Sequence, residues 1–130
     1  MFTSIHTPKA PEAIGPYSQA LITGNLIFTS GQIAINPATQ QIDAQTIEEQ
    51  TEQVMQNLKA ILEASGSAME YAIKTTCYLA DMNDFAAFNE IYGRYFTGKP
   101  ARSCVAVKTL PKNALVEVEV IAELEYAIPD

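Results

Sequence analysis

The chain has 130 residues, of which 48% are hydrophobic, and its mean hydropathy is +0.02, so one domain with its own core is expected. Fifteen acidic and eight basic side chains give a formal net charge of −7, which disfavours broad electrostatic binding to nucleic acid or to an anionic membrane. The sequence has no long apolar run and no basic stretch followed by an apolar one at its start, so we expect neither a transmembrane helix nor a secretory signal.

The first third of the chain contains a predicted hairpin. Residues 1–16 are expected to be irregular, because Pro residues interrupt them repeatedly. Residues 17–22 and 26–30 are short apolar runs joined by Gly24 and Asn25, a pair typical of a turn. These two runs are therefore predicted to form a β-hairpin.

Two amphipathic helices are predicted next. Thr46 with Glu49 three residues later is a capping-box pair, and the helix that it begins is expected to end at Gly66. Asp84 is predicted to cap the second helix, which Gly98 closes. The apolar stripes that would face a core are Ile47, Val54, Leu58, Ile61 and Leu62 in the first helix, and Phe85, Phe88, Ile91 and Tyr95 in the second.

Three more strands complete the predicted elements. Residues 72–79 are rich in β-branched and aromatic side chains, and residues 102–108 and 115–126 form two strands at the end of the chain. The order of elements is β-β-α-β-α-β-β. This order predicts a single α+β domain over residues 1–130, with one mixed sheet and both helices packed on one face.

The last predicted strand has two different faces. Its apolar face is expected to pack against the helices, because the alternation has the period of a strand. The other face mixes acidic side chains with Leu115 and Ile121, so it contacts either solvent or another copy of the chain, and the sequence leaves both alternatives open. The apolar positions are Val116, Val118, Val120, Ala122, Leu124 and Tyr126, and the acidic ones are Glu117, Glu119, Glu123 and Glu125.

Few residues suit metal, cofactor or nucleophilic chemistry. Cys77 and Cys104 lie in separate predicted strands, and we expect both to be reduced thiols in a cytosolic protein. His6 is the single histidine, which disfavours a His-based triad. The sequence has no Cys-x-x-Cys pair, phosphate-binding loop or dinucleotide fingerprint, so we expect no metal and no cofactor.

The strongest functional signal is a permanent cation near a carboxylate. Arg102 stands at the start of one predicted strand, and Glu117 lies on the strand predicted to be its neighbour. Because a guanidinium presents a planar fork of donors, Arg102 suits a carboxylate ligand, although an ion pair at a strand edge explains the same pattern. Further polar candidates, each with an ordinary structural explanation as well, are Tyr17, Ser30, Asn89 and Cys104.

Several motifs, in order along the chain, resemble the RidA (YjgF/YER057c/UK114) family of reactive-intermediate deaminases. They are Ile-Gly-Pro-Tyr-Ser-Gln-Ala at 14–20, Thr-Ser-Gly-Gln at 29–32, Asn-Asp-Phe at 83–85, Pro-Ala-Arg-Ser at 100–103, Leu-Pro-Lys at 110–112 and Val-Glu-Val-Glu at 116–119. The resemblance covers nearly the whole chain and implies a chorismate-mutase-like (YjgF-type) α+β fold. It also implies a homotrimer in which the sheets form a central barrel and the active sites lie between subunits.

The resemblance further implies a hydrolase that removes reactive intermediates in the cytoplasm. Members of the family deaminate 2-enamines and 2-imines such as 2-aminoacrylate to 2-oxoacids and ammonia, without a metal or a cofactor. The implied activity is that of a 2-iminobutanoate/2-iminopropanoate deaminase acting on small 2-imino acids.

The roles of individual residues follow from the same resemblance. Arg102 matches the arginine that holds the substrate carboxylate, and Glu117 matches the glutamate that positions water. The resemblance places the other matched residues in or beside the pocket, namely Tyr17, Ser30, Gly31, Phe85, Asn89 and Cys104.

One departure from the family lies close to Arg102. Many members carry an aromatic residue before Pro-Ala-Arg, where this chain has Lys99, so the substrate range is left open. Two alternatives to the deaminase also remain. A non-catalytic regulatory module that binds 2-oxoacids would use the same pocket, whereas an RNA-directed endoribonuclease or translation inhibitor is disfavoured by the charge of −7.

Overall fold

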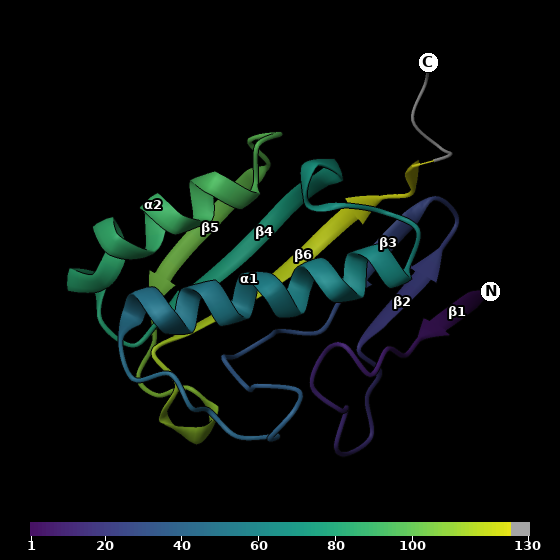
Figure 1. The fold of residues 1–130 in the computed structure, drawn as a ribbon. Helices are drawn as coiled ribbons and strands as arrows, with labels where there is room; N and C mark the ends of the chain where they lie inside the picture. The colour runs from purple at the N-terminus through teal and green to yellow at the C-terminus, as the bar shows by residue number, and fades with distance from the viewer. Residues whose placement is uncertain (126–130) are drawn as a thin grey trace.

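A computed structural model describes residues 1–125, which form one six-stranded mixed sheet with both helices on one face (Figure 1). The strand order is β1-β2-β3-β6-β4-β5; the pair β4–β5 is parallel and the other pairs are antiparallel. This is the α+β arrangement predicted from the order of elements. The strands are β1 (Phe2–Ile5), β2 (Ala20–Thr23), β3 (Leu26–Thr29), β4 (Ala72–Leu79), β5 (Ala101–Ala106) and β6 (Val116–Glu123), and the helices are α1 (Ile47–Ala64) and α2 (Phe85–Tyr95).

The N-terminal part of the sheet differs from its prediction in one strand. The hairpin β2–β3 is confirmed, with Thr23 opposite Leu26 and Gly24 in the left-handed conformation that the tight turn requires. Residues 2–5, expected to be irregular, form β1 instead and pair with β2. The prolines begin only at Pro8, and β1 is an exposed edge strand that has no buried face to produce an alternating pattern.

Helix α1 begins and ends as predicted. The hydroxyl of Thr46 accepts a hydrogen bond from the Glu49 N–H at 3.1 Å and donates one to the Glu49 carboxylate at 3.0 Å. The first bond caps the helix as predicted, and the second joins the side chains of the predicted pair. Gly66, with φ of +87°, follows the last turn. Neither α1 nor α2, the α-helices of residues 1–125, is long and apolar enough to cross a bilayer.

The predicted cap of α2 is wrong. Asp84 makes no capping hydrogen bond from its side chain, because its backbone is already in the right-handed helical region and not in the extended region that an N-cap residue adopts. Asp84 instead ends a short 3-10 turn, Met82–Asp84. That turn is capped by the carboxylate of Asp81, which accepts a hydrogen bond from the Asn83 N–H at 2.9 Å.

The predicted adjacency of the two functional strands is also wrong. Strand β4 lies between β5 and β6, so Arg102 is paired with Thr75 of β4, and Glu117 is paired with Tyr78 of β4. The reason is the crossover from β4 through α2, which returns the chain parallel to β4 on its free edge. Strand β6 then pairs with the other edge of β4.

The two faces of β6 confirm the predicted alternation. The side chains that face the helices are almost completely buried, at 0–1% exposure: Val116, Val118, Val120, Ala122 and Leu124. The face without helices carries half-buried acidic residues together with large apolar ones, including Phe28 and Val105, which are 39% and 48% exposed. The strand ends at Glu123, and the predicted member Tyr126 lies outside the described residues.

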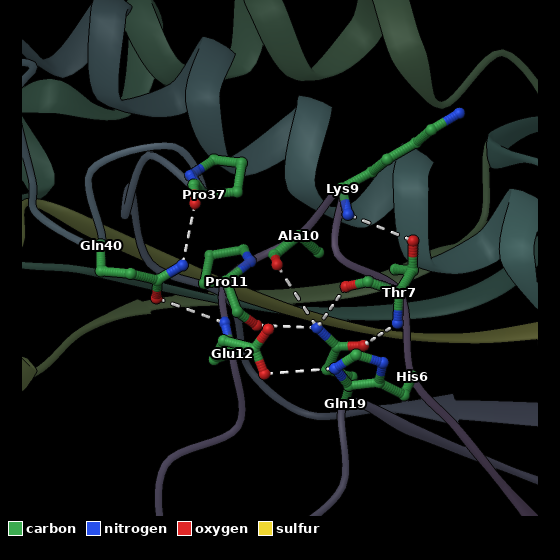
Figure 2. Close-up of polar contacts among 9 residues, drawn as sticks. All are labelled: His6, Thr7, Lys9, Ala10, Pro11, Glu12, Gln19, Pro37 and Gln40. Carbon is green, nitrogen blue, oxygen red and sulfur yellow. Dashed lines mark hydrogen bonds and ion pairs between the residues drawn. The ribbon is translucent and has the colours of Figure 1, made fainter.

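A buried glutamine holds the N-terminal loop against the sheet (Figure 2). The Gln19 side chain accepts from the Thr7 N–H at 2.7 Å and donates to the carbonyl oxygens of Thr7 at 3.0 Å and Pro11 at 2.8 Å. Gln19 is only 2% exposed, so these bonds replace water for several backbone groups at once. One buried side chain therefore ties both ends of the loop of residues 7–12 to the sheet.

We predict that Gln19→Leu lowers the free energy of unfolding by about 1–3 kcal/mol, since it leaves buried backbone groups unpaired. Gln45→Leu is the matched control, because Gln45 is exposed and donates only to the Asp43 carbonyl. Urea denaturation of both variants measures the difference. Equal losses in the two variants would contradict the role of Gln19.

Candidate functional site

Arg102 lies on the helix side of the sheet and is oriented by α2. Its Nη1 donates to the Asn89 side-chain oxygen at 2.6 Å. Its Cζ lies 4.7 Å from the ring centroid of Tyr92 and 5.4 Å from that of Phe85. The two aromatic faces attract the cation, and Asn89 occupies one of its donors, so the remaining N–H groups are free to bind an anion.

A buried hydrogen bond supports the ring beneath Arg102. The hydroxyls of Tyr92 and Thr75 lie 2.6 Å apart, and Thr75, the strand partner of Arg102, is fully buried. Burial raises the pKa of Tyr92, with an opposing contribution from the Thr75 hydrogen bond, so the phenol stays neutral at physiological pH. Strand β4 and helix α2 therefore hold the guanidinium from two sides.

The sequence did not single out Tyr92 as a site residue. A helical spacing would have found it, because Phe85, Asn89 and Tyr92 recur at intervals of four and three residues and so share one face of α2. The stripe predicted for this helix contained Phe85, Phe88, Ile91 and Tyr95, and it passed over Tyr92.

Arg102 opens onto a hollow of about 640 Å³ between α2 and the start of β5. Its lining includes Asn89, Tyr92, Phe96 and Lys99. Among the lining residues that the structure describes, none is acidic. The hollow is therefore a local cationic site on a chain whose net charge is −7.

Glu117 lies in a different hollow, of about 380 Å³, whose lining includes Tyr17, Gly31 and Lys112. The carboxylate packs directly on the Gly31 backbone, where a Cβ atom would overlap a carboxylate oxygen of Glu117. Burial raises the pKa of Glu117, and the neighbouring carboxylate of Glu119 raises it further. Glu117 is thus a carboxyl group that takes up a proton more readily than an exposed glutamate does.

Ser30 and Cys104, the remaining predicted residues, lie next in the chain to Gly31 and two residues after Arg102, respectively. The Ser30 hydroxyl donates to the Ser18 carbonyl at 2.6 Å, and its N–H donates to the Gln19 carbonyl at 2.9 Å, which fixes the backbone that leads into Gly31. Cys104 lies two residues after Arg102 in β5 and pairs with Cys77 of β4. Burial raises the pKa of the Cys104 thiol, with partial opposition from Arg102, so Cys104 is a neutral thiol beside the guanidinium.

Strand β4 lies between the hollow of Arg102 and the hollow of Glu117, so the two hollows do not meet within one chain. We call them the Arg102 half and the Glu117 half. Arg102 pairs with the buried Thr75 on the helix side, whereas Glu117 projects from the opposite face of β6 beside Glu119. Phe85, Asn89 and Cys104 belong with Arg102, and Tyr17 and Gly31 belong with Glu117. Within one chain, a small ligand therefore cannot contact both charged residues.

Neither half resembles a metal centre. Among residues 1–125 no three His, Cys, Asp or Glu side chains converge as ligands of one ion. The polar groups that the structure places together are a guanidinium with an amide in one half, and a carboxylate with a phenol in the other. Such a set suits binding of a small anion and proton transfer to or from water.

Comparisons with known proteins cover almost the whole described chain. A family model described as Endoribonuclease L-PSP matches residues 7–124. A RutC family protein of Pyrococcus horikoshii is 53% identical over 122 residues, which is 93% of this chain and 97% of that protein.

Two solved structures are also similar. YyfA of Yersinia pestis, described as a member of the conserved Rid protein family, has a TM-score of 0.93 at 45% identity and covers 95% of this chain and 100% of its own. Escherichia coli TdcF with bound serine has a TM-score of 0.88 at 42% identity and covers 93% and 98%.

We predict that Gly31→Ala lowers the pKa of Glu117 towards its ordinary value of 4.5, because the added methyl group displaces the carboxylate into solvent. The free energy of unfolding should change by less than about 1 kcal/mol, since only the end of a flexible side chain has to move. Carboxyl-carbon NMR titration measures the pKa. Gly93→Ala is the control, because its methyl group would meet no atom within 4 Å. A pKa unchanged by Gly31→Ala would contradict the packing.

Proposed function

The chain belongs to the RidA (YjgF/YER057c/UK114) family, and from this premise we propose that it hydrolyses reactive 2-enamines and 2-imines, such as 2-aminoacrylate, to 2-oxoacids and ammonia. Its mixed sheet with two helices on one face is the chorismate-mutase-like, YjgF-type fold of that family. The observation that carries the proposal is the division between an anion-binding half around Arg102 and a proton-transfer half around Glu117.

The proposed site forms between neighbouring copies in a homotrimer. In a closed ring each copy offers its Arg102 half to one neighbour and its Glu117 half to the other, so every site is complete. The face of the sheet without helices supports this arrangement, because Phe28 and Val105 expose large apolar surface there beside half-buried carboxylates. Burying that face in a central barrel would remove the apolar surface from water.

Arg102 would hold the substrate carboxylate. Asn89 and the rings of Tyr92 and Phe85 fix the plane of the guanidinium before a ligand arrives, which lowers the entropy lost on binding. A bidentate pair with the carboxylate then sets the position of the adjacent imine carbon. Lysine, a single point charge on a flexible stem, would not give the same orientation.

Glu117 would activate water on the other side of the imine. An enamine that takes a proton at C3 becomes the iminium ion directly, and an imine becomes the same ion when its nitrogen is protonated. As the oxygen of water bonds to C2 of this ion, a water proton passes to Glu117, which gives a carbinolamine. Glu117 returns that proton to the nitrogen, and the C–N bond breaks as the hydroxyl oxygen forms the C=O bond and gives up its own proton to water, so ammonia leaves and the 2-oxoacid remains. The raised pKa of Glu117 suits it to accept and return this proton.

A second candidate is a non-catalytic module that binds 2-oxoacids. The Arg102 half alone is sufficient for such binding, and bound serine in TdcF supports a ligand of this size with one carboxylate. Saturable binding of 2-oxobutyrate without imine turnover would favour this candidate. An RNA-directed activity is a weaker candidate, because the chain carries a net charge of −7 and would repel a phosphate backbone.

A coupled assay tests the deaminase directly. A pyridoxal-phosphate dehydratase generates 2-aminoacrylate from serine, and a trap reports the imine that survives. We predict that Arg102→Ala reduces turnover by about a hundredfold, since losing a bidentate charged pair costs about 3 kcal/mol.

Arg94→Ala is the matched control for that assay. Arg94 lies on α2, is exposed and pairs with Glu90 at 3.1 Å, so its loss is expected to leave turnover unchanged. If Arg102→Ala is as active as the parent, then Arg102 does not hold the substrate.

A further inference from the structure

Lys99 places a second cation in the hollow of Arg102. Both residues line this hollow of about 640 Å³, and the part of the lining that the structure describes holds no carboxylate. Within residues 1–125 the ion pairs are His6–Glu12 and Arg94–Glu90, so neither Lys99 nor Arg102 is neutralised by a neighbour. Two unpaired cations in one concavity concentrate anions there, even though the whole chain is acidic.

The backbone at Lys99 is held in an unfavourable conformation. Its φ is +54°, in the left-handed region that costs a non-glycine residue about 1–2 kcal/mol, and its N–H donates to the Phe96 carbonyl at 3.2 Å. The preceding Gly98 packs against the Glu70 carbonyl, where a Cβ atom would lie 2.5 Å from the oxygen. This turn is therefore fixed by contacts on both sides, and it directs the chain from Lys99 through Pro100 into Arg102.

The strained backbone at Lys99 lies beside the candidate site, so the choice of a lysine at this position needs an explanation. Asn and Gly occupy left-handed positions at lower cost than Lys, so the backbone alone does not account for a lysine here. The lysine also lies in a cavity wall, where its ammonium group can reach a ligand through a flexible stem. Position 99 thus has an energetically unfavourable backbone conformation and a side chain suited to binding an anion.

We propose that the site favours 2-imino acids with a second carboxylate, which Lys99 binds while Arg102 holds the carboxylate next to the imine. The proposal rests on the deaminase function and names its substrate class. A monocarboxylate leaves Lys99 facing water, whereas a 2-imino dicarboxylate pairs both cations in the hollow. Since Lys99 is exposed, we expect a preference of about fivefold, the upper end for a solvated pair.

The test compares two substrates of equal chain length, 2-iminoglutarate and 2-iminopentanoate. Each is generated in solution by an amino-acid oxidase from the corresponding amino acid, and a trap reports the imine that survives. The parent should have a kcat/KM about fivefold higher for 2-iminoglutarate, and Lys99→Asn should bring the ratio close to one. Asn removes the charge and tolerates the left-handed backbone.

Lys108→Asn is the control variant, because Lys108 is exposed and does not belong to the described lining of the hollow. It should keep the ratio of the parent. Raising the salt concentration should reduce the ratio of the parent towards that of Lys99→Asn. If the parent prefers 2-iminopentanoate, or if Lys99→Asn leaves the ratio unchanged, the role of Lys99 is overturned.

Failure of the deaminase itself is distinguishable from failure of this inference. If the parent is also inactive in the 2-aminoacrylate assay, the proposed function fails; if it turns over neither of the two larger imines, calorimetric binding of 2-oxoglutarate and 2-oxopentanoate tests Lys99 without catalysis. A fivefold binding preference for 2-oxoglutarate that Lys99→Asn removes would support the second anion site. Equal affinities would overturn it.

Discussion

Strand β4 keeps the guanidinium of Arg102 away from the carboxylate of Glu117, and the organisation of the site depends on this separation. The two side chains leave the sheet on opposite faces, so they cannot form an ion pair within one chain. An ion pair between Arg102 and Glu117 would have neutralised both groups, and neither charge would then be available to bind a ligand. The fold instead leaves one cation and one carboxylate free, and the symmetric association that we propose would bring them together.

The scaffold holds each charged group through neutral neighbours. On the helix side, the hydrogen bond between Thr75 and Tyr92 fixes the ring on which Arg102 lies. On the other side, Gly31 lets the Glu117 carboxylate pack on backbone. Gln19 fixes the loop that lines the same hollow. Because neutral groups supply this support, the charges remain available for a ligand, and desolvation can raise the pKa of Glu117.

Local features of the fold were predictable, whereas strand order was not. The helix cap at Thr46, the turn at Gly24 and the alternation of β6 follow from a few neighbouring residues, and all are present. The position of β4 between β5 and β6 depends on a crossover through α2, which no short motif encodes. The motifs that resemble RidA supplied the candidate site residues, but they did not predict that these residues lie on two faces of the sheet. Helical spacing places Tyr92 beside Asn89, but its role as a support for Arg102 shows only in its contacts with Thr75 of β4 and Arg102 of β5.

Subunit mixing tests the division of the site most directly. Arg102→Ala and Glu117→Ala proteins are unfolded together in equal amounts, refolded and assayed, with each variant refolded alone as the control. The account predicts that each variant alone is inactive and that the mixture regains about a quarter of the parent activity, because a random ring pairs an intact Arg102 with an intact Glu117 at that frequency. A mixture that forms mixed oligomers and stays inactive would show that both residues must come from the same copy, which would contradict the account.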